Sequence, residues 1–196
     1  MSSEQQTARI VGIFTKVERL KSWFFKIVEE DVGDDIPRDD IAASVVIIAI
    51  CLPLMLYFYL HQAMSTGFFT IKFDILEAVF LYGILLYWIV TSALILIGQK
   101  HASRDLDSFG GLAFATVGSV WLIFIFPFDF INFAEASPDI LRILLQWISN
   151  EIALIILILA FIAHLVFAVF AGFQRVYVRK AMSRLKKEAI SADLNT

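Results

Sequence analysis

The sequence has little of what builds disulfide-stabilised or nucleic-acid-binding proteins. Its 196 residues include one cysteine, Cys51, so no disulfide can form within the chain. Charged residues make up 18% of the chain, and the formal net charge of −3 is too small to favour a nucleic-acid partner. Four prolines and nine glycines leave long stretches without a helix breaker. These shortages favour long helices and exclude a small disulfide-stapled fold.

Motifs of common catalytic and cofactor sites are also missing. The chain has no GxSxG elbow, Walker loop, GxGxxG turn, CxxC pair or HExxH zinc motif. The acidic stretch at residues 29–40 lacks the oxygen spacing and the distal Glu of an EF-hand. We therefore interpret the chain as non-enzymatic and expect no cofactor.

Apolar residues are abundant instead, at 59% of the chain with a mean hydropathy of +0.78. Four apolar runs, at residues 41–60, 75–98, 109–133 and 152–173, each reach the length of about 20 residues that a membrane-spanning helix needs. None alternates apolar with polar residues as a barrel strand would. The pattern predicts an all-α fold, an integral membrane four-helix bundle.

Lysine and arginine predict the orientation of these spans. Counted along the chain, the segments outside the spans hold six, one, two, one and six of them. With four spans, fourteen of the sixteen lie on one side, which the positive-inside rule assigns to the cytoplasm. We expect a multi-pass membrane protein with both termini cytoplasmic.

The segments that flank the spans divide the chain further. We expect a cytoplasmic arm and acidic linker at residues 1–40, a transmembrane domain at 41–174 and a basic cytoplasmic tail at 175–196. Residues 8–28 carry apolar side chains at three- and four-residue steps, which is typical of an amphipathic helix. That helix either lies in the membrane interface, with Trp23 as an anchor, or packs on the cytoplasmic ends of the spans.

The linker and the tail differ in charge. The linker holds seven acids, and Asp39 or Asp40 is expected to cap the first span. The tail is expected to continue the fourth span as a helix. Its six basic residues favour anionic lipid head groups, although positive-inside topology alone also explains them.

Small residues mark the faces where helices are expected to pack, because close backbone approach holds helices together in lipid. They recur at four-residue steps in the third and fourth apolar runs, with His164 among them. The positions are Gly111, Ala115 and Ser119 in the third run, and Ala160, Ala168 and Gly172 in the fourth. Pro53 and Pro127 interrupt the first and third runs and free a backbone carbonyl in each.

Few ionisable groups are candidates for chemistry. His164 is the one expected near mid-membrane, either as a proton relay or ligand contact, or as a neutral ring hydrogen-bonded to a hydroxyl such as Ser119 or Tyr87. Four groups are expected at the outer face, where they could form a cation site: His61, Glu77, Asp129 and Glu151. A carboxylate at the end of the third run, as Asp129 would be, is disfavoured by the helix dipole.

Residues 94–128 read LILIGQKHASRDLDSFGGLAFATVGSVWLIFIFPF. A hydrophobic span, a short polar loop, Ser-Phe and a span rich in small residues resemble the Yip family of Rab-GTPase-interacting membrane proteins and its prokaryotic relatives. The resemblance implies a polytopic helical protein with a cytoplasmic N-terminal segment and a role in membrane organisation, without catalytic residues.

We therefore expect a membrane-organising or scaffold protein, or an accessory subunit of a larger membrane complex. Its partners would be the lipid bilayer, further copies of itself or other membrane subunits. The alternative is a small oligomeric channel or transporter with His164 and Asp129 in the pathway. A membrane enzyme that uses His61 and the outer carboxylates is the third possibility.

Overall fold

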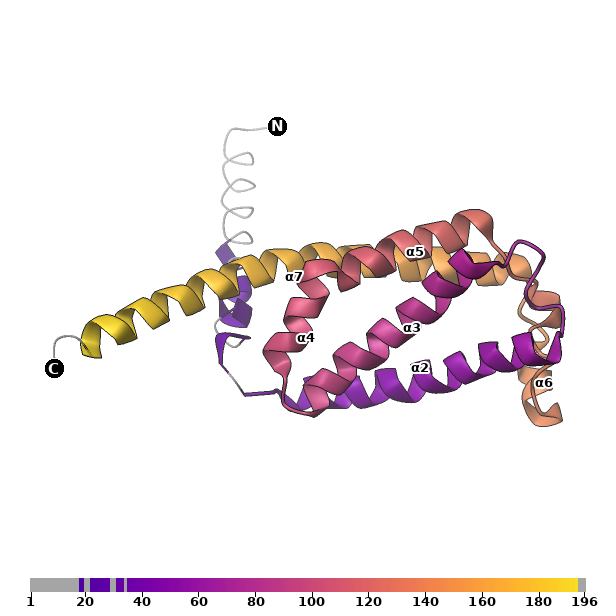
Figure 1. Cartoon of the computed structure of the whole chain (residues 1–196), viewed down its shortest axis with the longest axis horizontal. Coiled ribbons are helices and arrows are strands. Elements are labelled where there is room, and N and C mark those ends of the chain that lie inside the picture. Colours follow the sequence, from indigo (N-terminus) through magenta and orange to yellow (C-terminus); the bar gives the residue numbers. More distant parts are fainter. Residues whose placement is uncertain (1–17, 20–21, 29–30, 34, 194–196) are drawn as a thin grey trace, which may run out of the picture. The chain divides into compact units, whose positions relative to one another are not determined.

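The computed structural model describes residues 18–19, 22–28, 31–33 and 35–193, and most of these residues are helical (Figure 1). The expected amphipathic helix at residues 8–28 lies largely outside this range. Helices follow one another along the chain, and the only extended pairing among the described residues is an isolated bridge between Phe69 and Phe128. The elements are α2 (Arg38–Met64), α3 (Ile75–Leu96), α4 (Lys100–Leu106), the π-helix η1 (Asp107–Gly111), α5 (Leu112–Ile125), the 3₁₀-helix η2 (Phe130–Asn132), α6 (Asp139–Leu145) and α7 (Asn150–Asp193).

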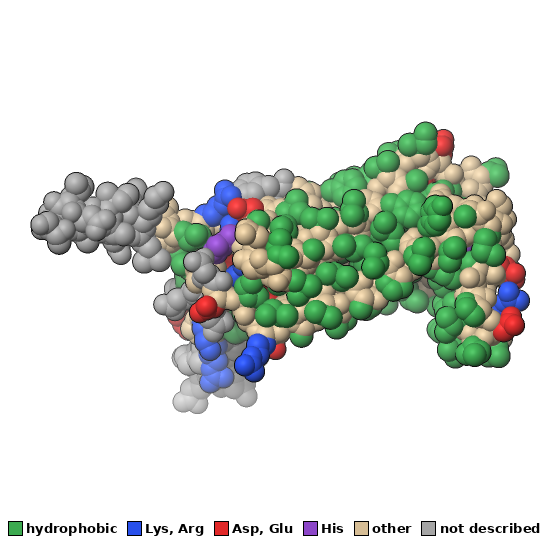
Figure 2. Space-filling view, turned by 60° about the horizontal axis from the view of Figure 1, so that its bottom comes forward, with side chains coloured by type: hydrophobic (Ala, Val, Ile, Leu, Met, Phe, Trp, Pro, Cys, Tyr) green, Lys and Arg blue, Asp and Glu red, His purple; other side chains and the backbone are tan. Residues whose placement is uncertain are grey.

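The all-α class and the membrane character predicted from the sequence are confirmed in this coarse form. Three of the described helices, α2, α3 and α7, are long and apolar enough to cross a membrane. Hydrophobic side chains dominate the visible middle of the molecule, with few charged groups among them (Figure 2). Phe124, for example, leaves 82% of its surface exposed, which is costly in water but not in lipid.

The third apolar run behaves differently from the prediction. Its helix, α5, has 14 residues and ends at Ile125, so the expected helix through residue 133 is wrong in its last third. Proline has no backbone N–H and restricts the residue before it, and Phe126, which precedes Pro127, takes a left-handed φ of 42°. The chain then leaves the helix.

The backbone beyond α5 is satisfied by a distant loop. The Thr70 N–H donates to the Pro127 carbonyl at 3.0 Å, and the Asp129 N–H donates to the Phe68 carbonyl at 2.7 Å. Non-helical backbone is tolerated at membrane depth only where protein buries it, and Pro127 and Phe128 are buried. The aromatic loops before α3 and after α5 therefore support each other.

The helix starts show one correction and one cooperative cap. Pro37, not an aspartate, is the N-cap of α2. Asp39 and Asp40 lie in the first turn instead, where the positive end of the helix dipole stabilises their negative charge. Asp74 is the N-cap of α3, and its side chain accepts hydrogen bonds from the first turn. The Glu77 carboxylate in turn accepts a hydrogen bond from the Asp74 N–H at 3.0 Å. This capping box secures the start of α3 against the loop before it.

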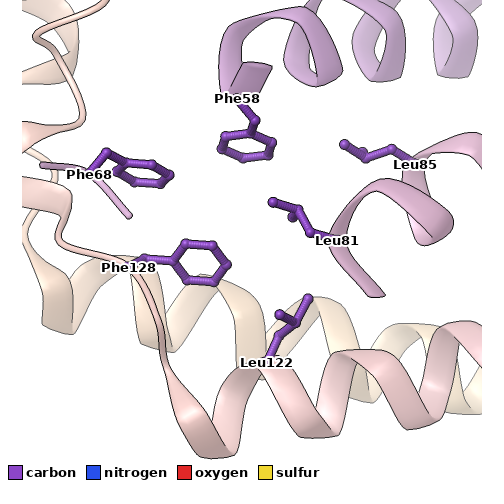
Figure 3. Close-up of a cluster of buried hydrophobic side chains, with 6 residues drawn as sticks. All are labelled: Phe58, Phe68, Leu81, Leu85, Leu122 and Phe128. Carbon is purple, nitrogen blue, oxygen red and sulfur yellow. The ribbon is translucent and has the colours of Figure 1, made fainter. Parts of the chain in front are cut away.

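The described residues form two compact units, one of residues 36–172 and one of the described parts of residues 1–35 and 173–196. In the first, α3 packs closely against α2 and α5, whereas the main chain of α7 stays farther from these three helices. Six apolar side chains from α2, α3, α5 and the two aromatic loops converge on one space (Figure 3). In the second unit, Phe24 and Phe25 meet Tyr177 edge to face, with ring centroids 5.4 and 6.0 Å apart.

Candidate functional site

One end of the 36–172 unit is built from aromatic rings, and we call it the aromatic end. Phe68 lies at its centre and is fully buried. Its ring stacks with Phe58 at 5.7 Å and Phe128 at 5.5 Å and meets Phe130 edge to face at 5.2 Å. The other rings of this end are Phe69, Phe73, Phe126 and Phe133. Together these rings form a packed apolar cluster at this end of the unit.

His61 is buried within the aromatic end. Its Nδ1 lies 2.5 Å from the Thr66 hydroxyl oxygen, and its Nε2 lies 3.1 Å from the Phe133 carbonyl oxygen. The Tyr57 hydroxyl donates to the same carbonyl and lies 2.6 Å from the Ser137 hydroxyl. His61 therefore joins α2 to two loops, through Nδ1 to the loop before α3 and through Nε2 to the loop after α5.

The carboxylates expected at the outer face each have separate protein partners. Glu77 accepts from the Trp121 indole N–H at 2.8 Å. Asp129 is the N-cap of η2 and not the end of a long helix, so the unfavourable dipole expected for it does not arise. Glu151 accepts from the Ser149 hydroxyl at 2.6 Å. Within the part of the chain that the structure describes, no group of three or more His, Cys, Asp or Glu could hold a metal ion.

The opposite end of the same unit holds polar side chains in pairs, and we call it the polar end. An Arg104 guanidinium nitrogen lies 3.1 Å from an Asp40 carboxylate oxygen. The Tyr87 hydroxyl donates to Asp107 at 2.5 Å, and the Ser103 hydroxyl donates to the Thr91 carbonyl at 3.0 Å. All but Tyr87 line a small cavity of about 120 Å³, which Ser44 and Ser92 also line.

Asp107 supplies a partly buried carboxyl to the polar end. Burial raises the pKa of its carboxyl above the ordinary value, while the Tyr87 hydrogen bond and the charges of Arg104 and His164 lower it in part. Burial disfavours the charged form because water no longer solvates it. The polar end therefore holds a carboxyl that takes up a proton more readily than an exposed aspartate.

A π-helix carries Asp107 at this end. Gly110 has a φ of 150°, a conformation that side chains other than glycine rarely adopt, and marks a kink between α4 and α5. A Cβ at Gly111 would lie 2.2 Å from the Tyr87 ring, so Gly111 lets that ring approach the backbone. π-helical turns occur often at functional sites. Sequence reasoning missed this end, and the Gly110-Gly111 pair just after Asp107 was its only local signal.

A larger cavity of about 260 Å³ lies between the two ends. Its walls come from α2, α3, α5, α7 and the aromatic loops, and they include all six side chains of Figure 3. Trp88 lines this central cavity and the cavity of the polar end. The two cavities are therefore neighbours on either side of one indole ring.

His164 faces the central cavity together with Ser119 and Ala160. Its ring meets Trp88 edge to face, with ring centroids 5.3 Å apart. The hydroxyls considered as its partners bond elsewhere, since Ser119 donates to the Ala115 carbonyl and Tyr87 donates to Asp107. The Nε2 atom of His164 is buried and has no hydrogen-bond partner among the described residues.

The small residues of the third and fourth runs have mixed surroundings. Ala115 is fully buried in a cluster with Tyr87 and Leu112, against which Ala168 packs. The place where Gly118 would carry a Cβ is bounded by Phe80 and Ile84 of α3. At Gly172, no described atom lies within 4 Å of that place. The absence of a side chain at Gly118 therefore lets α5 lie close to α3.

Comparison with protein-family models, curated proteins and solved structures gives no match to this chain. The resemblance to the Yip family stays a prediction from residues 94–128.

Proposed function

We propose that this chain is a multi-pass membrane protein with a non-enzymatic role, either in membrane organisation or as an accessory subunit of a larger membrane complex. The observation that carries the proposal is the apolar interior of the 36–172 unit. The central cavity is lined by hydrocarbon side chains apart from Trp88, Ser119 and His164, and the aromatic end closes one side of it. A transporter usually needs several polar groups at this depth.

Four crossings and cytoplasmic termini are part of this proposal. At 1.5 Å per residue α5 is about 21 Å long, less than the hydrocarbon thickness of about 30 Å. The segment 126–129, in which Pro127 and Phe128 are buried, can complete the crossing, because its backbone bonds to residues 68–70. The Lys and Arg distribution supports an even number of crossings, since an odd number would separate the two basic ends.

Cysteine labelling tests this topology in a background with Cys51 replaced. Ser65 and Glu135 are exposed on the loops at the aromatic end, and Ala102 is exposed on α4. Cysteines at Ser65 and Glu135 should react with an impermeant thiol reagent from outside, and one at Ala102 should react only after permeabilisation. Labelling of the Ala102 position in intact cells would overturn the proposed orientation.

The short helix α6 offers a surface for lipid or for a membrane partner. Its residues Ile140, Ile143 and Leu144 are exposed, as is Trp147 just beyond it. Aromatic and apolar residues outside a span are typical of a segment that lies at the membrane interface. The basic tail would bind anionic lipid head groups at the other face.

Purification from native membranes tests the role itself. The full-length protein should come with a stoichiometric membrane subunit or as a defined homo-oligomer, with recovery insensitive to His164→Gln. A monomer free of partners that drives solute flux in liposomes would contradict the proposal.

A small channel or transporter is the second candidate, favoured by His164, which lines the central cavity and whose buried Nε2 has no hydrogen-bond partner among the described residues. Asp129, the other residue considered for a pathway, receives hydrogen bonds from Asn132 and Asn150. Proton or solute flux in liposomes should then be lost in His164→Gln. Absence of flux from folded wild-type protein would exclude this candidate.

A further inference from the structure

We propose that the central cavity binds one apolar molecule that carries a single hydroxyl or carbonyl oxygen, and that His164 hydrogen-bonds this oxygen. This inference goes beyond the proposed function and holds whether the chain acts as a subunit or a channel. It rests on the size of the cavity, its lining and the unpartnered imidazole nitrogen.

The cavity is large enough for such a ligand. Its volume is about 260 Å³. An apolar cavity of roughly 150 Å³ lined by aliphatic and aromatic side chains stays dry and binds benzene. The space here therefore accepts a longer apolar group. Native interiors leave few voids of this size, because close packing favours the folded state.

The lining selects for a mostly apolar molecule. Rings of the aromatic end and aliphatic side chains of α3 and α5 form most of the wall. A buried water needs two to four polar partners, and few polar side-chain atoms face this space. A hydrocarbon ligand with one polar group matches this lining better than water does.

His164 determines where the polar group would lie. Its Nε2 is buried and lacks a hydrogen-bond partner in the part of the chain that the structure describes. Buried polar atoms are usually satisfied, and one that is not calls for a partner from outside the chain. Imidazole Nε2 donates or accepts a hydrogen bond according to its tautomer, so either a carbonyl or a hydroxyl oxygen can serve.

The bilayer provides a route into the cavity. The main chain of α7 lies farther from α2, α3 and α5 than α3 does from its two neighbours. Leu157, Ala160 and Phe161 of α7 line the cavity together with His164, so the loosely packed helix forms one of its walls. A membrane-dissolved molecule can pass between side chains there without crossing water.

Three probes of equal chain length test the proposal: decane, decanol and methyl octyl ketone, each with a bromine at the far end. Bromine quenches tryptophan fluorescence on contact, and Trp88 lines the cavity. The signal is the quenching of wild-type protein in phosphatidylcholine nanodiscs minus that of Trp88→Phe. Probe concentrations are expressed per volume of lipid, so that differences in partitioning between water and bilayer do not affect the comparison of the three affinities.

Quenching should saturate, and one oxygen-bearing probe should bind about five- to tenfold more tightly than decane, as expected for one net hydrogen bond. In His164→Leu this preference should fall to about one. Ala160→Leu should weaken the binding of all three probes, because the larger side chain fills part of the cavity. The matched variant Ala163→Leu, at an exposed position of α7, should leave binding unchanged.

Equal affinities for the three probes in wild type would overturn the proposal, as would quenching that never saturates. Equal affinities are also the result expected if a lipid acyl chain fills the space. A second measurement does not depend on variant folding. The nitrogen resonance of His164 Nε2 in ¹⁵N-histidine-labelled wild type should shift with decanol or the ketone and not with decane. No shift with any probe would refute the role of His164.

Discussion

The aromatic end and the polar end of the 36–172 unit are held together by different interactions. At the aromatic end, Phe68 and its neighbours exclude solvent through ring contacts that depend mainly on shape and area. At the polar end, the Tyr87 hydroxyl and the Asp107 carboxyl depend on each other, because a buried polar group without a partner is costly. The aromatic end therefore contributes to stability through buried area, whereas the structure of the polar end depends on specific hydrogen bonds.

Truncation of the central ring should break the aromatic end. Phe68→Ala removes a fully buried ring, and a core substitution of this kind costs about 3–5 kcal/mol. Phe124→Ala is the matched control, because Phe124 is largely exposed on α5 and should face lipid. Thermal or denaturant unfolding in detergent micelles measures both. Equal losses for the two variants would show that burial in this cluster is not what stabilises the unit.

Overpacking should disturb the junction between α5 and the polar end. Ala115→Leu forces a larger side chain into the cluster of Tyr87 and Leu112, at an expected cost of about 1–3 kcal/mol, and Ala168→Leu should act similarly. Ala113→Leu, at an exposed position of the same helix, is the control. If melting is unchanged in both overpacked variants, these faces contact lipid.

Protonation should distinguish the polar end from the aromatic end. Because the pKa of Asp107 is raised in the folded state, its contribution to stability is full below the unfolded pKa and is lost as pH rises through the folded pKa. Asp107→Asn still accepts the Tyr87 hydrogen bond and should abolish this decline. Unfolding of wild type and variant across mildly acidic to neutral pH gives the difference, with Asp139→Asn of α6 as control. A difference that does not change with pH would contradict the assignment.

The ion pair at the polar end should matter least. Arg104 and Asp40 are each about one-third exposed, and exposed pairs contribute roughly 0–1 kcal/mol. A double-mutant cycle with Arg104→Gln and Asp40→Asn, measured by unfolding, isolates their coupling. A coupling well above about 1 kcal/mol would mean that the pair is effectively buried in the membrane-inserted protein.

Local features of the sequence were sufficient to predict the three longest helices, whereas the third apolar run was predicted too long and α4 and α6 were not predicted. Long apolar runs predicted α2, α3 and α7, because helix formation satisfies the backbone without reference to the rest of the chain. Asp74 and Glu77 at the start of α3 are a local feature as well, because they lie three residues apart where the helix dipole favours acids. Pro127 was recognised as an interruption, but the direction the chain takes after it was not.

Partnerships between distant residues required the tertiary structure. His61 bonds to a carbonyl 72 residues away, and Arg104 pairs with Asp40 across 64 residues. Neither contact leaves a periodic trace in the sequence. His164 was singled out from the sequence because it is ionisable within an apolar run, yet its unpartnered nitrogen depends on how Ser119 and Tyr87 are engaged elsewhere. The length of the apolar runs determined which segments form the three longest helices, whereas packing determined which polar atoms meet.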